Sequence, residues 1–413
     1  MKTTDCPVYF FENLPTSLVE HTLSFLRPEE VARLRAVNRS MQKSVDNTAY
    51  GSFLTYCTNM RVGSHREVHE TAAIQGCPLI LEWIENMHGK GVFDERICAV
   101  AAHFGKTEVL KWLRARNCPW DPMTCAEAAR RGHLDTLKWV RHNGCTWDEM
   151  TFELAVSESR HDILHWVLKQ SPPCPYDERG CKKAAENGDV TTLMWIRDRG
   201  CPWDGEVLYE AARAKHEETL EWASQNGCPR DHSLLMGVLE ATLDGDLDTL
   251  KLLHKYECCP LHLDICKYAA KYKHMHVLLW ARENNFPWDE WTCASAAESG
   301  DLTILKWLRK NGCPWDGRAC ANAARKGHLH VLRWARAQNP PAPWSDLTFY
   351  WALWSGEIEV LRWLELNKCP RDDRVLEYAQ DGDSGSVQWV QDHILSKPLD
   401  WSISLIDRHS VVR

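Results

Sequence analysis

Residues 118–144 read CPWDPMTCAEAARRGHLDTLKWVRHNG, and the part up to residue 139 returns almost complete at residues 313–334. Shorter versions of the same run recur along most of the chain. A sequence that resembles itself at a regular spacing is typical of repeat proteins, in which one small supersecondary unit is stacked many times. We therefore expect a stack of similar units.

A recurring tryptophan sets the length of the unit. It lies seven residues after the central glycine of each unit, or after the residue that replaces this glycine. The positions are Trp83, Trp112, Trp139, Trp166, Trp195, Trp222, Trp280, Trp307, Trp334, Trp363 and Trp389, with Leu252 at the one vacant place. The first and last are eleven steps and 306 residues apart, which gives a mean period of about 28 residues. The spacing predicts about twelve units over residues 64–395.

Within one unit, the pattern predicts two short helices. Small side chains at i, i+3 and i+4, namely Cys125, Ala128 and Ala129, indicate the buried face of the first helix. Gly132 ends this helix, and an apolar stripe that includes Leu137 indicates the second. We predict an all-α fold: an α-solenoid of helix-turn-helix units in which the alanines let helices approach closely and each helix tryptophan covers the neighbouring unit.

The same run resembles the ankyrin repeat. The segments AARRGHLD at 128–135, LKWV at 137–140 and NG at 143–144 fall in the register of that family. The Thr-Pro-Leu-His opening of ankyrin repeats is missing, and the period is about six residues shorter than the family's 33. The deficit lies where ankyrin repeats form a projecting β-hairpin. The resemblance therefore implies a short variant without this finger, with a compact Cys-Pro-Trp-Asp turn and little or no sheet.

Length and charge restrict the function classes. A chain of 413 residues exceeds the usual size of one compact core, whereas a repeat stack buries surface only between neighbours. The net charge is −8, which argues against a broad nucleic-acid face, so we predict no nucleic-acid partner. No stretch has the length and apolar character of a membrane helix, and the first residues lack the apolar core of a signal peptide. We expect a soluble, intracellular protein, cytoplasmic or nuclear, that is a monomer and binds no membrane.

The eighteen cysteines follow the repeat rather than forming separate pairs. They occupy either the Cys-Pro turn or the first helix of a unit. We interpret them as reduced thiols that pack as small apolar residues, since a disulfide framework is typical of short secreted chains.

One segment departs strongly from the repeat. Across residues 229–260 the turn tryptophan is replaced by Arg230 and the helix tryptophan by Leu252. The stability of a repeat array is roughly a sum of unit and nearest-neighbour terms, so the loss of both indoles predicts a soft joint over residues 229–268.

The most variable positions among the units lie just before the central glycine, at the end of the first helix. They are expected to be exposed, and we predict that they form the face that binds a partner. The candidate residues are Phe104, Arg130, Arg131, Glu186, Arg213, Lys271, Tyr272, Arg325, Lys326 and Trp354. Phe104, Tyr272 and Trp354 are the most informative because exposed aromatic residues often anchor interfaces. The alternative is that these are solvated positions under little constraint.

The first sixty residues lack the repeat signature. They contain Leu-Pro at 14–15, Leu-Ser-Phe-Leu at 23–26 and LRAVNR at 34–39, and Pro15 and Pro28 each suit the first turn of a helix. Residues 11–50 resemble the F-box, although Asn38, Met41 and Tyr50 depart from its usual residues. The likeness implies contact with the Skp-type linker subunit of a cullin-RING ubiquitin ligase through eight residues: Leu14, Pro15, Leu18, Leu23, Leu26, Pro28, Leu34 and Val37. The alternative is a helical cap that shields the first repeat from water.

Motifs of catalysis are missing from the sequence. There is no glycine-rich phosphate loop, no His-Glu-x-x-His and no Gly-x-Ser-x-Gly, so we expect no enzymatic activity, no cofactor and no catalytic residue. The recurring Gly-His pair is interpreted as local hydrogen bonding at a helix start. Cys258, Cys259, His262 and Cys266 are close in sequence, but no second ligand pair follows, so no metal site is predicted.

These observations divide the chain into an F-box-like helical region (1–60), a repeat solenoid (64–395) and a C-terminal cap or tail (396–413). The predicted function is an adaptor: the N-terminal region docks on a ubiquitin ligase while the solenoid binds a protein target. The alternative is an ankyrin-type scaffold or competitive inhibitor with no link to a ligase.

Overall fold

The computed structural model describes residues 65–76, 78, 81–82, 85, 91–259, 264–372, 374–380 and 384–395. These residues form helices and connecting turns, and no strand occurs among them. The prediction of an all-α helical-repeat fold is confirmed. The predicted F-box-like region with its eight residues Leu14 to Val37, and the predicted tail at 396–413, lie outside the described residues.

The chain divides into two compact units, Met1–Ala223 and Ser224–Arg413. In the first unit, the first helices of successive repeats are α4 (His65–Gln75), α6 (Glu95–His103), α8 (Pro122–Arg130), α10 (Glu149–Ser157), α12 (Glu178–Glu186) and α14 (Glu206–Arg213). The second helices are α7 (Thr107–Ala115), α9 (Leu134–His142), α11 (His161–Leu168), α13 (Val190–Arg197) and α15 (Glu217–Gln225), whose last two residues pass the boundary.

The second unit repeats the alternation. Its first helices are α16 (His232–Asp244), α18 (Ile265–Lys271), α20 (Glu290–Ser299), α22 (Gly317–Arg325), α24 (Asp346–Ser355) and α26 (Val375–Gln380). Its second helices are α17 (Leu247–Lys255), α19 (Met275–Glu283), α21 (Leu302–Lys310), α23 (Leu329–Arg336), α25 (Ile358–Leu366) and α27 (Ser384–Val390), and a π-helical turn, η2 (Gln391–Leu395), follows.

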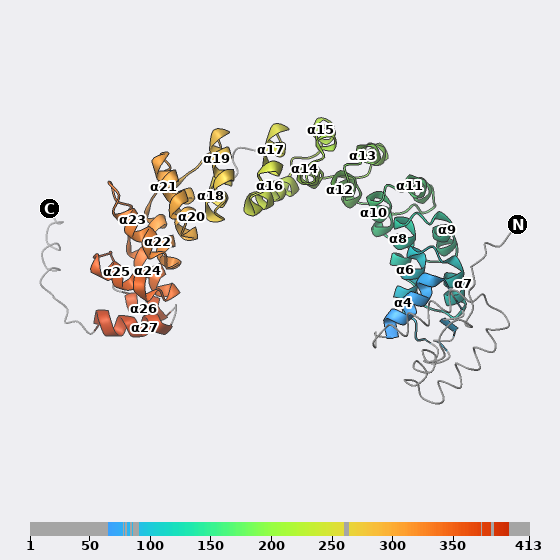
Figure 1. The fold of residues 1–413 in the computed structure, drawn as a ribbon, viewed down its shortest axis with the longest axis horizontal. Coiled ribbons are helices and arrows are strands. Elements are labelled where there is room, and N and C mark those ends of the chain that lie inside the picture. The colour runs from blue at the N-terminus through green and yellow to red at the C-terminus, as the bar shows by residue number, and fades with distance from the viewer. Residues whose placement is uncertain are drawn as a thin grey trace, which may run out of the picture. The chain divides into compact units, whose positions relative to one another are not determined.

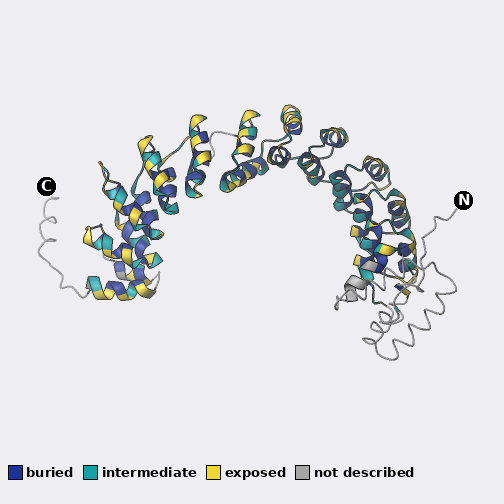
Figure 2. Cartoon of the chain, viewed as in Figure 1, coloured by how far each residue is buried: buried dark blue, intermediate teal, exposed yellow. Residues whose placement is uncertain are grey.

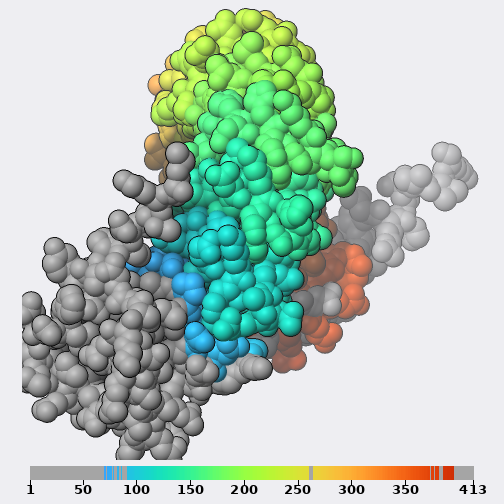
Figure 3. Space-filling view, turned by 90° about the vertical axis from the view of Figure 1, so that its right-hand side faces the viewer, coloured from blue at the N-terminus to red at the C-terminus, as the bar shows by residue number. Residues whose placement is uncertain are grey.

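Within each unit, every first helix packs against the first helix of the next repeat, and the second helices form a separate row (Figure 1). Buried residues recur along the helices of each repeat (Figure 2). Most of them have small or branched side chains. In α8, Cys125, Ala128 and Ala129 are fully buried, as their spacing predicts. In space-filling form, the repeats of the first unit follow one another in chain order from blue to green (Figure 3). Because Cys125, Ala128 and Ala129 are small, they allow the first helices to pack closely against one another.

The repeated tryptophans of the second helices lie mostly outside this core. Trp139 is half-buried, and of the other described ones only Trp280 and Trp389 are buried. Two of the helix tryptophans contact the neighbouring repeat: Trp195 lies 4.7 Å from the ring of His165, and Trp280 lies 5.6 Å from the ring of His254. Trp139 packs edge-on against the turn tryptophan of its own repeat, Trp120, with 6.0 Å between ring centroids. The same pair recurs as Trp147–Trp166, Trp203–Trp222, Trp288–Trp307, Trp315–Trp334 and Trp344–Trp363.

An arginine two residues after the helix tryptophan connects one repeat to the next. The guanidinium of Arg114 lies 4.1 Å from the ring centroid of Trp120 and donates a hydrogen bond to the carbonyl oxygen of Cys118. Arg141 makes the same two contacts with Trp147 and Cys145. Equivalent arginines stack on Trp203, Trp288, Trp315 and Trp344. In each of these turns, an arginine of the preceding repeat stacks on the turn tryptophan, and the turn tryptophan contacts the helix tryptophan of its own repeat.

All fifteen cysteines within the described residues are buried and free of disulfides. Cys98 and Cys118 have their sulfur atoms 3.8 Å apart, and Cys145 donates to the carbonyl oxygen of Asp121. Burial raises the pKa of several thiols, for example to about 12 at Cys320. The cysteines act here as neutral packing residues.

Candidate binding face of the first helices

The ten predicted partner-binding residues lie at the ends of first helices, one or two positions before the central residue of the repeat. Phe104, Arg131, Arg213, Tyr272, Lys326 and Trp354 are exposed, whereas Arg130, Glu186, Lys271 and Arg325 are half-buried. Five belong to each compact unit. The two groups have different surroundings.

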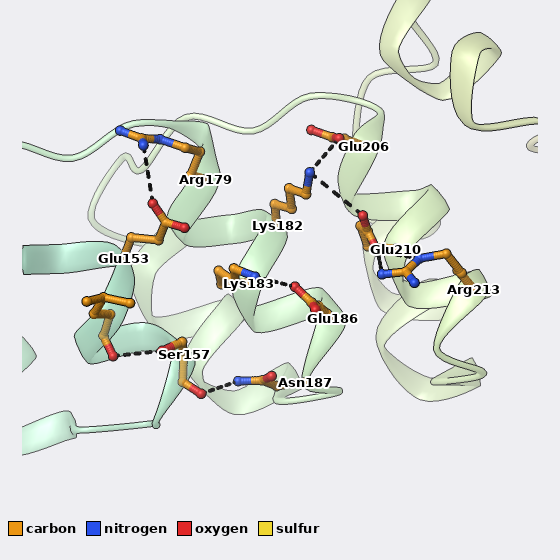
Figure 4. A network of polar contacts seen from close by, with 11 residues as sticks. Glu153, Ser157, Arg179, Lys182, Lys183, Glu186, Asn187, Glu206, Glu210 and Arg213 are labelled. Atoms are coloured by element: carbon orange, nitrogen blue, oxygen red, sulfur yellow. Dashed lines mark hydrogen bonds and ion pairs between the residues drawn. The ribbon is translucent and has the colours of Figure 1, made fainter. Parts of the chain in front are cut away.

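In the first unit, the predicted residues Glu186 and Arg213 belong to a network of ion pairs within and between the first helices α10, α12 and α14 (Figure 4). Arg179 of α12 lies 3.4 Å from a carboxylate oxygen of Glu153 of α10. In the other direction, Lys182 Nζ lies 2.6 Å from Glu206 Oε1 and 3.7 Å from Glu210 Oε1, both on α14.

Three of the predicted residues form ion pairs in this network or beside it. Arg213 pairs with the buried Glu210 at 2.5 Å, and this hydrogen bond raises the pKa of the arginine. Glu186 pairs with Lys183 at 2.7 Å, which holds the pKa of its carboxyl below the usual value. Arg130 lies 3.5 Å from Glu158. These side chains stabilise the stack and leave few unpaired charges for a partner.

The charges on this face are balanced. We define the first-helix face by the positions nine, six, five and two residues before the central residue of each repeat, which follow i, i+3, i+4 and i+7 spacing. On α8 to α14 these positions carry five cations, Arg130, Arg179, Lys182, Lys183 and Arg213, and five carboxylates, Glu127, Glu153, Glu186, Glu206 and Glu210.

In the second unit, the first-helix face forms a groove of about 510 Å³ across α20, α22 and α24. We call it the α20–α24 groove. It is lined by Trp291, Glu298, Asp316, Gly317, Arg318, Ala321, Asn322, Arg325, Ser345, Leu347 and Trp351. Of the predicted residues, only Arg325 belongs to this lining.

Small residues of α22 make the hollow. A Cβ atom added to Gly317 would meet nothing within 4 Å, and Ala321 lies one turn further along the same helix. Trp291 of α20 and Leu347 of α24 occupy the repeat position that Arg318 occupies in α22. Their side chains are 44% and 55% exposed. Large apolar side chains thus border an open space above a glycine and an alanine.

Cations lie on the aromatic rings of the groove. The guanidinium of Arg318 is 4.0 Å from the ring centroid of Trp291, and its hydrogen bond to Asp316 raises its pKa. Arg325 donates to Glu298 at 2.7 Å and lies 5.4 Å from the centroid of Trp351.

Two further aromatic and cationic residues border this region. Trp354 packs edge-on against Trp351 with 5.7 Å between centroids. Lys271 lies 3.5 Å from Glu298. The groove therefore combines two indoles with two arginines that are each paired with a carboxylate, and Trp354 and Lys271 lie at its border.

The sequence-based choice of positions found one edge of this face and missed the rest. It selected the last two residues of each first helix because they vary among repeats. The lining residues Trp291, Arg318, Asn322, Leu347 and Trp351 lie five or nine residues before the central glycine. Continuing the i, i+3, i+4, i+7 pattern backward from Trp354 and Arg325 would have found all of them except Trp291, which the same step reaches from Glu298.

The recurring Gly-His pair has a different role from the predicted local capping. His133, at the start of α9, makes no side-chain cap bond. Its Nε2 lies 3.1 Å from the carbonyl oxygen of His103, thirty residues earlier in the preceding repeat. His274 and His328 reach back in the same way to Leu243 and Glu298. The histidine therefore connects repeats.

Searches for metal-binding and membrane-spanning features gave negative results for the part of the chain that the structure describes. No group of three or more His, Cys, Asp or Glu side chains there is arranged to hold a metal ion. His262, one member of the Cys-rich cluster, lies outside that part. None of the helices searched has the length and apolar character required to cross a bilayer.

Comparison with known proteins gave structural likenesses only. No family model matches the sequence, and no curated protein matches it. Among solved structures, the chain is similar to the pentatricopeptide repeat protein PPR10 in complex with an 18-nt psaJ RNA element, with 11% identity and a TM-score of 0.38, covering 92% of this chain and 68% of that one. A structure of PPR10 from maize gives 14% identity and a TM-score of 0.26, covering 87% and 67%.

The prediction that no nucleic acid binds this chain is wrong as an exclusion. A helical-repeat protein to which the chain is structurally similar was solved with RNA bound. The physical error was to judge from the net charge of −8, which sums over all 413 residues, whereas binding depends on the local charge of one face. Single-stranded RNA is accordingly a test ligand below.

Proposed function

We propose that this chain is a helical-repeat scaffold that binds a partner protein through the α20–α24 groove. The observation that carries the proposal is the exposure of Trp291, Leu347 and Trp354 on one face of neighbouring first helices. Exposed large apolar residues that gather on one face are typical of interaction sites rather than of ordinary solvated surface.

The chemistry of the groove favours a protein partner. Tryptophan and arginine are the residue types most enriched among the energetic hot spots of protein interfaces. Each groove arginine already has a carboxylate partner, Asp316 for Arg318 and Glu298 for Arg325. These pairs leave no continuous row of unpaired cations along the groove for a chain of phosphates to follow, whereas a peptide can carry a few carboxylates among apolar side chains.

A second binding surface would connect the bound protein to a ubiquitin ligase. On the F-box resemblance, residues 11–50 bind a Skp-type linker subunit, so that the chain acts as the target-binding subunit of a cullin-RING ubiquitin ligase. Two binding surfaces on one chain raise the effective concentration of the target near the ligase. The chain itself then performs no chemistry. The alternative is a scaffold or competitive inhibitor that uses the groove alone.

Affinity capture from eukaryotic cell extract tests both levels. Full-length chain is compared with Trp291→Ala/Trp351→Ala, and with Met194→Ala as a control that changes an exposed apolar residue of α13. We expect the double variant to lose at least one protein partner that the control retains. Loss of no protein, or loss of RNA only, overturns the proposed function.

A second pair of variants separates the adaptor from the scaffold. Leu14→Ala/Pro15→Ala is expected to abolish capture of a Skp-type subunit while leaving the groove-dependent partner bound. If the unaltered chain retains no Skp-type subunit at micromolar concentration, the ligase link is rejected and the scaffold remains.

A further inference from the structure

We propose that the α20–α24 groove recognises an acidic linear peptide, in which an apolar side chain enters the hollow above Gly317 while neighbouring carboxylates meet the surrounding cations. This inference rests on the proposed function and deepens it by naming the chemistry of the partner. Three features carry it: an unfilled apolar hollow in the groove, an excess of positive charge on the face around the groove, and an amide with unused hydrogen-bonding capacity.

The hollow accepts one side chain of moderate size. It exists because α22 has Gly317 and Ala321 where α24 has Asp346 and Tyr350. The space above Gly317 is open, since an added Cβ atom has no neighbour within 4 Å. The indole of Trp291 and the side chain of Leu347 are exposed on the adjacent helices and line the same groove. An inserted apolar side chain would remove this apolar surface from water.

The charge of this face differs from that of the first unit. On α18 to α24, the positions of the first-helix face carry four cations, Lys267, Lys271, Arg318 and Arg325, and two carboxylates, Asp264 and Glu298. Asp316, which lines the groove and pairs with Arg318, is a third carboxylate of this region. Lys326 adds a further exposed cation at the end of α22. The corresponding face of α8 to α14 carries five charges of each sign. A local excess of positive charge on a chain of net charge −8 is complementary to an acidic segment.

The floor of the groove can bind peptide backbone. Asn322 donates from Nδ2 to the carbonyl oxygen of Ala294 at 3.3 Å, and within the described residues this is the one hydrogen bond of its side chain. Its side-chain oxygen can accept from a backbone N–H of a bound chain, and its second N–H can donate to a backbone C=O. An extended peptide offers a backbone N–H and C=O at each residue, so one amide can fix its register.

A library of random dodecapeptides, displayed on phage and selected on the immobilised full-length chain, provides the probe. We expect the enriched sequences to contain Asp or Glu within two residues of Leu, Phe or Trp. They should bind about tenfold more weakly when the carboxylates are replaced by Lys, and their affinity should fall as salt is raised.

Gly317→Leu is the decisive variant. The Cβ atom of the new side chain meets nothing within 4 Å, and leucine is a better helix former than glycine, so we expect the fold to be retained, as circular dichroism would check. It should weaken binding of the selected peptides at least tenfold, and Lys267→Glu/Lys271→Glu should weaken it about fivefold. Leu366→Ser, at an exposed position of α25, is the matched control and should change nothing.

The outcomes separate this inference from the function on which it rests. Enrichment of basic peptides, no enrichment, or peptides that bind Gly317→Leu as well as the unaltered chain would overturn the inference. Groove-dependent capture of a folded protein would then still support the proposed function. Tighter binding of a 12-nt single-stranded RNA than of any selected peptide, abolished by Trp291→Ala/Trp351→Ala, would overturn both.

Discussion

His133 of one repeat lies against Gly105 of the preceding repeat, so closely that a Cβ atom on Gly105 would come within 2.8 Å of the imidazole Nδ1. Gly105 has a φ of 64°, which a glycine adopts without strain, and His133 reaches past it to the carbonyl oxygen of His103. The same contact joins Gly188 to His216, Gly245 to His274 and Gly300 to His328. The glycine of one repeat thus makes room for the histidine of the next.

Replacing Gly105 by alanine should lower the free energy of unfolding by more than the cost of placing an alanine in the left-handed region. Positive φ costs a residue with a Cβ atom about 1 kcal/mol, and forcing the imidazole aside adds about 1–3 kcal/mol. Gly144→Ala is the matched control, because Gly144 has a φ of 85° but no atom within 4 Å of an added Cβ. Urea denaturation followed by tryptophan fluorescence should show a larger loss for Gly105→Ala.

The double variant Gly105→Ala/His133→Ala completes this cycle. Its free energy of unfolding should lie above the value expected if the two single effects were additive, because removal of the imidazole relieves the clash. Additive effects would show that the contact between the two residues contributes nothing.

The inter-repeat histidines should make stability depend on pH. The pKa of His133 is lowered, first by burial, which opposes the effect of its hydrogen bond to His103, and then by positive neighbours that include Arg160. The pKa of His328 is also lowered, first by burial. Between the ordinary value of about 6.5 and the lowered value, the unfolded chain binds more protons than the folded chain. Their contribution is therefore complete above about pH 6.5 and is lost as the pH falls below it.

The variant His133→Gln/His328→Gln tests this dependence. Its loss of stability between pH 7 and pH 5 should be smaller than that of the unaltered chain, measured from urea midpoints at each pH. His142→Gln, at an exposed position, controls for the removal of a histidine as such. Equal slopes for all three proteins would contradict the assignment.

The fold could be predicted from the sequence because its signal is repeated many times. Cys125, Ala128 and Ala129, at i, i+3 and i+4, predict the buried face of one first helix. The same pattern recurs in other repeats and predicts the same helix there. The binding groove could not be predicted in this way. Gly317 and Ala321 are weak signals within one helix, and their meaning depends on Trp291 and Leu347 of the adjacent helices. The role of Arg141 was missed for a similar reason, since its indole partner belongs to the next turn.

Arg141→Ala should weaken the junction between two repeats. The guanidinium lies 3.8 Å from the ring centroid of Trp147 and donates a hydrogen bond to the carbonyl oxygen of Cys145. A partly exposed cation–π contact and a charge-assisted hydrogen bond together account for about 1–3 kcal/mol. Amide hydrogen exchange should accelerate in α9 and α10 first.

Two comparisons make this result specific. Arg141→Lys should recover part of the loss, because an ammonium group can approach the indole but cannot reproduce the planar stacking of a guanidinium. Arg362→Ala removes an exposed arginine whose ion pair with Glu359 spans 3.6 Å, and it should change stability by less than about 0.5 kcal/mol. Similar effects of Arg141→Ala and Arg362→Ala would refute the proposed role.

Glu210→Gln should separate stability from binding. Glu210 is buried and forms ion pairs with both Lys182 of α12 and Arg213 of its own helix. The pair with Lys182 links two first helices of the first unit. Removing its charge leaves both cations without this partner. Because they are partly exposed, the loss should be about 1–2 kcal/mol rather than the 3–5 kcal/mol of a fully buried pair.

Capture of the groove-dependent protein partner by Glu210→Gln should remain unchanged at temperatures where the chain is folded, because α14 lies outside the α20–α24 groove. Glu108→Gln, in the exposed pair with Lys111, controls for loss of a surface carboxylate. Trp291→Ala/Trp351→Ala should show the opposite pattern, with partner capture lost and the urea midpoint of the first unit kept. If Glu210→Gln also abolished capture while remaining folded, the balanced face of the first unit would belong to the surface that binds this partner, and the assignment of that surface to the α20–α24 groove alone would be wrong.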